Sequence, residues 1–149
     1  MTGGENTRAD CPFCRIALGE VEGYVVWQEA HTLAFLDARP LFLGHCLVVP
    51  RGHYETLADL PQALLHPLLA AVQCVAQGVE RGMGADGTLV AINNRVSQSV
   101  PHLHVHVIPR RRGDGLKGFF WPRQQYESEA QRAAVQEAIR RAIAALHGE

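Results

Sequence analysis

The sequence of 149 residues predicts an α+β fold built on a mainly antiparallel sheet. Five short apolar segments separated by turn-prone residues indicate strands, and two longer stretches repeat apolar residues at helical spacing. The resulting order, β-β-β-α-β-β-α, lacks the regular strand–helix alternation that predicts a parallel sheet. Because 47% of the residues are hydrophobic and no linker divides the chain, we expect residues 1–149 to form one domain.

The first three strands are expected at Tyr24–Gln28, Thr32–Leu36 and Cys46–Val49, where turn-prone residues separate the apolar runs. Three strands joined by short connections predict a meander. The preceding residues 1–10 are polar and show no period, so we expect them to be a flexible leader.

A long helix is expected from Pro61 to about Val79, with Gly82 and Gly84 as stop signals just beyond it. Pro67 lies inside this pattern, and we expect it to kink or split the helix because proline lacks a backbone N–H. The apolar residues at helical spacing are Leu65, Leu68, Leu69, Val72, Val75, Ala76 and Val79.

The fourth strand is expected at Thr88–Asn93, and the segment from His102 to Ile108 forms the fifth. This last segment alternates histidine with apolar residues, so its three histidines share one face of the strand.

A last helix is expected to begin at Ser128, whose spacing to Gln131 fits a capping box. Apolar residues recur along it at helical spacing and predict a buried stripe. They are Val135, Ala138, Ile139, Ala142, Ile143 and Leu146.

Charge and hydropathy exclude two classes of binding partner, nucleic-acid polymers and membranes. Lys plus Arg number 14 and Asp plus Glu 15, so the net charge of -1 provides no basic field for a nucleic-acid polymer. No unbroken apolar run approaches the roughly 20 residues of a membrane helix, and the polar N-terminus has no apolar core of a secretion signal. We therefore expect a cytoplasmic protein without a membrane partner.

Histidine is the unusual residue, with 8 in the chain and three of them at positions 102, 104 and 106. At this frequency, chance produces such a triplet with a probability of roughly 0.02. The spacing alone is compatible with a three-histidine catalytic metal site, or with phosphate chemistry in which one imidazole is the nucleophile. The flanking Gln98 and Ser99, with Arg110, Arg111 and Arg112 after the strand, favour phosphate.

The segment Pro101-His-Leu-His-Val-His-Val-Ile-Pro-Arg110 closely resembles the signature of the histidine triad superfamily of nucleotide hydrolases and transferases. Four further motifs occur in the order found in its bacterial branch, so the resemblance covers residues from about 11 to 122. These are Cys11-Pro-Phe-Cys14, Ala34-Phe-Leu-Asp37, Gly44-His-Cys-Leu-Val-Val-Pro50 and Arg51-Gly-His53.

The resemblance implies a five-stranded antiparallel sheet, one long central helix, a C-terminal helix and a homodimer. It also implies catalysis by His104, which would attack the α-phosphorus of a purine nucleotide derivative, and by His106, which would donate to the phosphate. No organic cofactor is implied. The implied nucleotide-binding residues are Phe35, Asp37, Asn94, Gln98, Ser99 and His106.

Two segments extend or depart from the family pattern. Relatives usually carry a glycine-rich loop before the triad, whereas Asn94-Arg-Val-Ser-Gln98 is shorter and has no glycine. Arg95 or the arginines after the triad would then compensate for missing backbone donors. The aromatic segment Phe119–Trp121 is a candidate for substrate contact as well as for simple packing.

The Cys11/Cys14 pair has the C-x2-C spacing of a zinc site or of a redox pair. The resemblance implies two further ligands, His53 and His102, and therefore structural zinc. A glutaredoxin-like pair would follow a strand, but residues Glu5 to Asp10 show no strand pattern.

The sequence therefore predicts a hydrolase or transferase that cleaves nucleoside phosphoramidates or dinucleoside polyphosphates through a nucleotidyl-histidine intermediate. The alternative hypothesis is a nucleotide-binding regulatory or partner-binding module with little catalysis. The histidines at positions 31, 45, 66 and 147 have no role that the sequence assigns.

Overall fold

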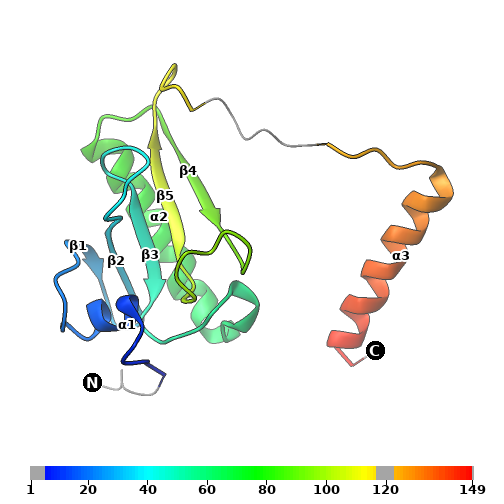
Figure 1. Ribbon diagram of the computed structural model, residues 1–149, viewed down its shortest axis with the longest axis horizontal. Coiled ribbons are helices and arrows are strands. Elements are labelled where there is room, and N and C mark those ends of the chain that lie inside the picture. Colours follow the sequence, from blue (N-terminus) through cyan, green and yellow to red (C-terminus); the bar gives the residue numbers. More distant parts are fainter. Residues whose placement is uncertain (1–5, 117–122, 149) are drawn as a thin grey trace. The chain divides into compact units, whose positions relative to one another are not determined.

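The computed structural model describes residues 6–116 and 123–148 (Figure 1). The chain divides into two compact units, Met1–Asp114 and Gly115–Glu149. The first unit holds the sheet, and the second holds one helix. That all 149 residues form one domain stays a prediction.

The first unit is built on a five-stranded sheet in the order β1-β2-β3-β5-β4, and each neighbouring pair is antiparallel. The expected α+β class, with a long helix and a C-terminal helix, is confirmed. The strands are β1 (Val25–Gln28), β2 (Thr32–Leu36), β3 (Cys46–Pro50), β4 (Gly87–Ile92) and β5 (Val105–Arg110).

Strand β5 begins at Val105, so His102 and His104 lie before it, which corrects the expected strand start. The physical reason is that this segment bonds outside the ladder. The Leu103 amide donates to the Tyr54 carbonyl at 2.6 Å, and the His104 ring donates to the His102 carbonyl. The histidine segment is therefore extended but tied to its own backbone and to the loop after β3.

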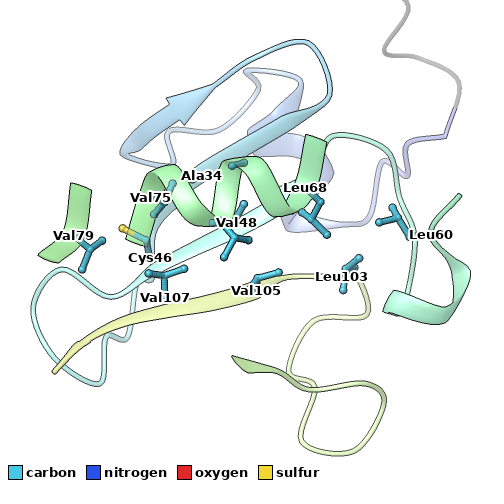
Figure 2. Close-up of a cluster of buried hydrophobic side chains, with 12 residues drawn as sticks. Ala34, Cys46, Val48, Leu60, Leu68, Val75, Val79, Leu103, Val105 and Val107 are labelled. Carbon is cyan, nitrogen blue, oxygen red and sulfur yellow. The ribbon is translucent and has the colours of Figure 1, made fainter. Parts of the chain in front are cut away.

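One face of the sheet packs against the long helix α2 (Leu65–Gly82). Figure 2 shows Leu68, Val75 and Val79 of this helix lying over side chains of the sheet such as Val48 and Val105. Alternate residues of each strand point to this face because the side-chain period of a strand is two.

The other face packs against the short helix α1 (Pro12–Ala17). Leu33 and Phe35 of β2 and Leu47 and Val49 of β3 form a second buried cluster with Phe13, Cys11 and Cys14. His106 lies directly opposite Leu47 in the β3–β5 pairing. This α1 face of the sheet therefore also holds the triad.

Helix α2 follows two short 3-10 helices, Leu57–Asp59 and Gln62–Leu64, so it begins at Leu65 rather than at Pro61, and it ends at Gly82, three residues beyond the expected Val79. Pro67 does not split the helix, because it is the third residue of α2, where backbone N–H groups have no partner within the helix in any case. By length and composition alone, Gln62–Gly82 passes the test for a membrane span, contrary to the expectation from unbroken runs. Its buried face packs on the sheet, as the core helix of a globular unit does.

The second unit contains helix α3 (Glu129–Leu146), and the expected start is confirmed because the Ser128 hydroxyl accepts from the Gln131 amide at 3.0 Å. Within the second unit no residue of α3 is buried, so the described residues of this unit alone supply no partner for the apolar stripe, and its burial stays a prediction. Exposure along the stripe ranges from 39% at Val135 to 84% at Leu146. Periodicity indicates which side chains of a helix share a face, but it does not supply a partner for that face.

Candidate functional site

Four side chains from three segments form a compact cluster of potential metal ligands. Cys11 caps α1, Cys14 lies within that helix, His53 follows β3, and His102 precedes β5. Their ligand atoms all lie within 4.8 Å of one another. Pro12 at the first position of α1 favours the turn that brings both thiols to one side.

The distances within this cluster match a tetrahedral ion. Nδ1 of His102 lies 3.4 Å from Sγ of Cys11 and 3.5 Å from Sγ of Cys14, and Nδ1 of His53 lies 3.4 Å from Sγ of Cys14. Typical zinc bond lengths and tetrahedral angles place sulfur and nitrogen ligands about 3.6 Å apart. These three distances therefore fit such an ion, and the remaining pairs lie within 4.8 Å.

The backbone also prepares His102 as a ligand. Its Nε2 lies 2.9 Å from the carbonyl oxygen of Pro50, which can only accept, so Nε2 carries the proton and donates it. Nδ1 is left with its lone pair toward the thiols. A second nitrogen that donates to a carbonyl is the usual support of a metal-binding histidine.

The redox interpretation of the cysteine pair has less support. Burial raises the pKa of the Cys14 thiol to about 11, whereas a reactive redox thiol needs a lowered pKa. Cys11 and Cys14 are both buried, and no strand of the described residues precedes them.

A cleft of about 800 Å³ opens beside this cluster on the α1 face of the sheet. The predicted residues Phe35, Asp37, Ser99, His104 and His106 all line it. One wall is apolar and includes Phe13, Ile16, Phe35 and Leu47. The polar part of its lining includes Asp37 and the two histidines.

His104 has one free ring nitrogen, and its own backbone decides which. Nδ1 lies 2.7 Å from the carbonyl oxygen of His102, so it carries the proton and donates. The lone pair is therefore on Nε2. A buried imidazole whose Nδ1 proton is held by a carbonyl and whose Nε2 offers a lone pair has the chemistry of a nucleophile.

His106 has the opposite tautomer because of His45, a residue that the sequence left without a role. The Leu41 amide donates to Nδ1 of His45 at 3.0 Å, so a neutral His45 carries its proton on Nε2. This nitrogen lies 3.0 Å from Nδ1 of His106 and donates to it. His106 is then left with a proton on Nε2, ready to donate to a bound group.

Burial keeps these two rings neutral. It is the largest cause that lowers the pKa of His106 to about 4, and it also lowers the pKa of His45. The nearby Asp37 carboxylate opposes the shift in both rings but does not outweigh burial.

The hydrogen bonds from the Leu41 amide to His45 and from His45 to His106, which form a donor chain, argue against a second metal site. Asp37, His45 and His106 lie close enough to hold an ion. Binding through Nε2 of His45 would displace its proton, and Nδ1 could not take that proton because it accepts from the Leu41 amide. We therefore interpret this group as a hydrogen-bonded chain.

The three-histidine metal site left open by the sequence is not supported. Among the described residues, His104 belongs to neither group of close ligand atoms. Nδ1 of His102 faces the thiols, and Nδ1 of His104 donates to a carbonyl, so the three rings do not converge on one point.

Two predicted nucleotide ligands do not line the cleft. Oδ1 of Asn94 accepts from the Leu57 amide at 3.0 Å. Oε1 of Gln98 accepts from the Arg95 amide at 2.8 Å, and its Nε2 donates to the Glu55 carbonyl at 2.6 Å. In this structure both side chains hold the loop before the triad in place.

The arginines after the triad are not in the cleft either. Arg110 pairs with Asp114, the Arg111 side chain donates to the Met83 carbonyl, and the Arg112 amide donates to Asp86. They therefore do not supply the positive charge at the phosphate that the sequence indicated. The aromatic segment Phe119–Trp121 lies outside the described residues.

Sequence reasoning missed His45 and Phe13. His45, Leu47 and Val49 alternate along one face at β3, and that alternation could have placed His45 beside the triad. Phe13 lies between the two cysteines of the motif. The motif was interpreted only for its thiols, and the Phe13 ring lines the cleft.

The HIT domain model matches residues 19–113 of this chain. The chain belongs to the HIT family. It is 42% identical over 107 residues to an uncharacterized HIT-like protein of Methanocaldococcus jannaschii, covering 70% of this chain and 82% of that protein. It is 32% identical over 121 residues to adenosine 5'-monophosphoramidase HNT1 of Saccharomyces cerevisiae, covering 78% of this chain and 73% of that protein.

Solved HIT structures share the fold. A protein of Streptococcus mutans superposes with a TM-score of 0.82 at 30% identity, covering 94% of this chain and 89% of that one. A zinc-bound histidine triad family protein of Mycobacterium smegmatis gives a TM-score of 0.68 at 33% identity, covering 91% and 97%.

Proposed function

We propose that this HIT protein is a nucleotide hydrolase or transferase that acts at the α-phosphate of purine nucleotide derivatives, namely nucleoside phosphoramidates or dinucleoside polyphosphates. The observation that carries this proposal is the pair of complementary tautomers in one cleft. His104 offers a lone pair on Nε2, and His106 offers a proton on Nε2, each set by a partner on its other nitrogen. The rings are 5.0 Å apart between centroids, so both reach one phosphate group.

The chemistry with a phosphoramidate has two steps. Nε2 of His104 attacks the α-phosphorus and forms a P–N bond, while the bond to the amine breaks; the amine leaves with that electron pair and takes a proton from water. Hydroxide then attacks phosphorus, the P–N bond to His104 breaks, and its electron pair returns to Nε2 as the nucleoside monophosphate is released.

The surrounding residues assist each step. The His102 carbonyl accepts from Nδ1 of His104 and so stabilises the positive charge that the ring gains on attack. His106 donates to the phosphate oxygens, and the Ser99 hydroxyl at the cleft can donate there as well.

The shape of the cleft supports a nucleotide as the bound group. Phe13 and Phe35, whose ring centroids are 5.2 Å apart, form an apolar wall for the base. The Asp37 carboxylate accepts hydrogen bonds from the ribose hydroxyls in this proposal. The name of the yeast relative, an adenosine 5'-monophosphoramidase, supports a phosphoramidate among the substrates.

Turnover of a panel of adenosine and guanosine phosphoramidates and dinucleoside polyphosphates tests the proposal, with His104→Ala as the main variant. We expect its turnover to fall below detection while mononucleotide binding stays measurable. His66→Ala is the matched control because that histidine is exposed on α2. Undiminished turnover by His104→Ala would overturn the mechanism, and binding without turnover in the wild type would favour the alternative, a nucleotide-binding module.

We further propose that Cys11, Cys14, His53 and His102 hold structural zinc. The sulfur–nitrogen distances and the donor set support this ion, and the zinc-bound relative supports it independently. Zinc would tie α1 to the segment after β3 and to the segment before β5, and it would keep both thiols as thiolates.

We also propose that the protein forms a homodimer and that it is cytoplasmic. The support for pairing is an apolar outer surface: Leu69 of α2 is 61% exposed, and Val90 of β4, at the edge of the sheet, is 46% exposed. Leu69→Glu is expected to yield monomers in light scattering, and an unchanged dimer would exclude this face. Metal-binding thiols are typical of a reducing compartment.

A further inference from the structure

His102 connects the group of potential metal ligands with the proposed nucleophile, His104. Its ring offers Nδ1 to the cluster, and its backbone carbonyl accepts from Nδ1 of His104 at 2.7 Å. The ring and the carbonyl belong to the same short segment before β5. A shift of the His102 backbone therefore moves both a ligand of the cluster and the oxygen that fixes the tautomer of His104.

A second connection passes through Phe13, which lies between the two cysteines. Its ring meets the His102 ring at 5.8 Å and the His104 ring at 5.1 Å between centroids, edge to face in both cases. Phe13 also lines the cleft where we propose the nucleotide base binds. One side chain therefore contacts a metal ligand, the nucleophile and the base wall.

Helix α1 depends on these contacts for its position. It has six residues, well below the roughly 12–15 that an isolated helix needs in water. Two of its ties to the sheet unit are the ligand positions Cys11 and Cys14, and another is the Arg51 guanidinium, which donates to the Ala17 carbonyl at 3.2 Å. Removal of a cation from the cluster leaves the Arg51 hydrogen bond and the packing of Phe13 and Ile16 to hold the helix.

We propose that occupancy of the Cys11/Cys14/His53/His102 site sets the positions of His104 and Phe13, so that metal binding and nucleotide binding strengthen each other. This inference rests on the proposed function, because it requires a nucleotide in the cleft. His102 and Phe13 are positioning residues in this scheme, and neither reacts with the substrate.

Because coupling between two sites is reciprocal, one factor describes both directions. Removal of the metal is expected to weaken mononucleotide binding by about tenfold, within the roughly 5- to 150-fold range of such couplings. Saturating mononucleotide is expected to tighten metal binding by the same factor. Nitrogen NMR of His104 is expected to show loss of the fixed Nδ1 proton in the metal-free chain.

The experiment measures adenosine monophosphate binding by calorimetry to metal-free and zinc-loaded full-length protein, and zinc affinity against a competing chelator with and without the nucleotide. Phe13→Leu keeps all four ligands but removes the ring, and we expect its coupling factor to fall at least threefold. Phe35→Leu is the matched control: it lines the same cleft without a ring contact to His102, so nucleotide binding weakens while the coupling factor stays.

Cobalt-loaded protein removes dependence on the folding of the metal-free chain, because its absorption bands report ligand geometry directly. We expect adenosine monophosphate to shift these bands in the wild type and to shift them less in Phe13→Leu. Nucleotide binding with a coupling factor of one and unshifted bands overturns this inference alone. Absence of nucleotide binding to the zinc-loaded wild type overturns both this inference and the proposed function.

Discussion

Replacing His45 by leucine removes both hydrogen bonds through which its ring connects the Leu41 amide to His106. Each such bond contributes about 1 kcal/mol, so the free energy of unfolding should fall by about 2 kcal/mol, or about 8 °C in Tm. His106 also loses the donor that holds its proton on Nε2. Because loss of one donor to the reacting phosphate oxygens costs about 10²–10³-fold, we expect turnover to fall about 10²-fold.

Steady-state kinetics with adenosine phosphoramidate, thermal unfolding and nitrogen NMR of His106 measure these effects together. His45→Gln is the informative partner variant, since its amide can accept from Leu41 and donate to His106, and we expect it to recover at least tenfold of the loss. His31→Leu, at an exposed position, is the control and should change neither quantity. Wild-type turnover in His45→Leu, with an unchanged His106 spectrum, would refute the role assigned to the donor chain.

Three further predictions follow from single features of the structure. Gly44 has a φ of +98°, and a Cβ there would lie 2.6 Å from Met83, so Gly44→Ala should lower the free energy of unfolding by about 1–2 kcal/mol in urea titrations. An equal stability would contradict this. Cys14→Ser should reduce bound zinc to well below one ion per chain in elemental analysis, whereas Cys74→Ser, at an exposed thiol, should not. Acid should destabilise the fold, because the pKa of His106 is about 4 in the folded chain and 6.5 otherwise, so the unfolded chain binds the extra proton as pH falls from 6.5 to 4. At pH 5 the free energy of unfolding should be lower by at most about 2 kcal/mol, and by about 1 kcal/mol after allowance for a half-buried ring. If His106→Gln loses as much stability on acidification as the wild type, His106 is excluded as the source of the loss.

Local patterns predicted most of the fold. Strand periodicity located all five strands, because each has apolar residues on at least one packed face, and the capping spacing located the start of α3 at Ser128. The features that local patterns could not predict depend on contacts with other segments. Strand β5 starts three residues late because Leu103 bonds to Tyr54, which no pattern within the segment reveals, and the described part of the second unit by itself contains no partner for the stripe of α3.

Part of the candidate site could likewise be predicted from the sequence, and part could not. The cysteine spacing and the family resemblance predicted the four metal ligands, and the structure brings their ligand atoms together. His45 was missed because its role requires the cross-strand register that sets β3 beside β5 and a backbone donor from Leu41. Asn94 was chosen for its place at the end of a strand before the loop; its side chain accepts from the Leu57 amide, and its nucleotide contact stays a prediction.

The central claim is that His104 becomes covalently bonded to the α-phosphorus of a nucleotide. Rapid acid-free quenching of the protein during turnover of adenosine phosphoramidate, followed by intact-mass and peptide mass spectrometry, tests it most directly. We predict a transient mass increase of one adenylyl group, located on His104 and lost on further incubation with water. Turnover at the same rate with no adduct, or with the adduct on another residue, would contradict the account.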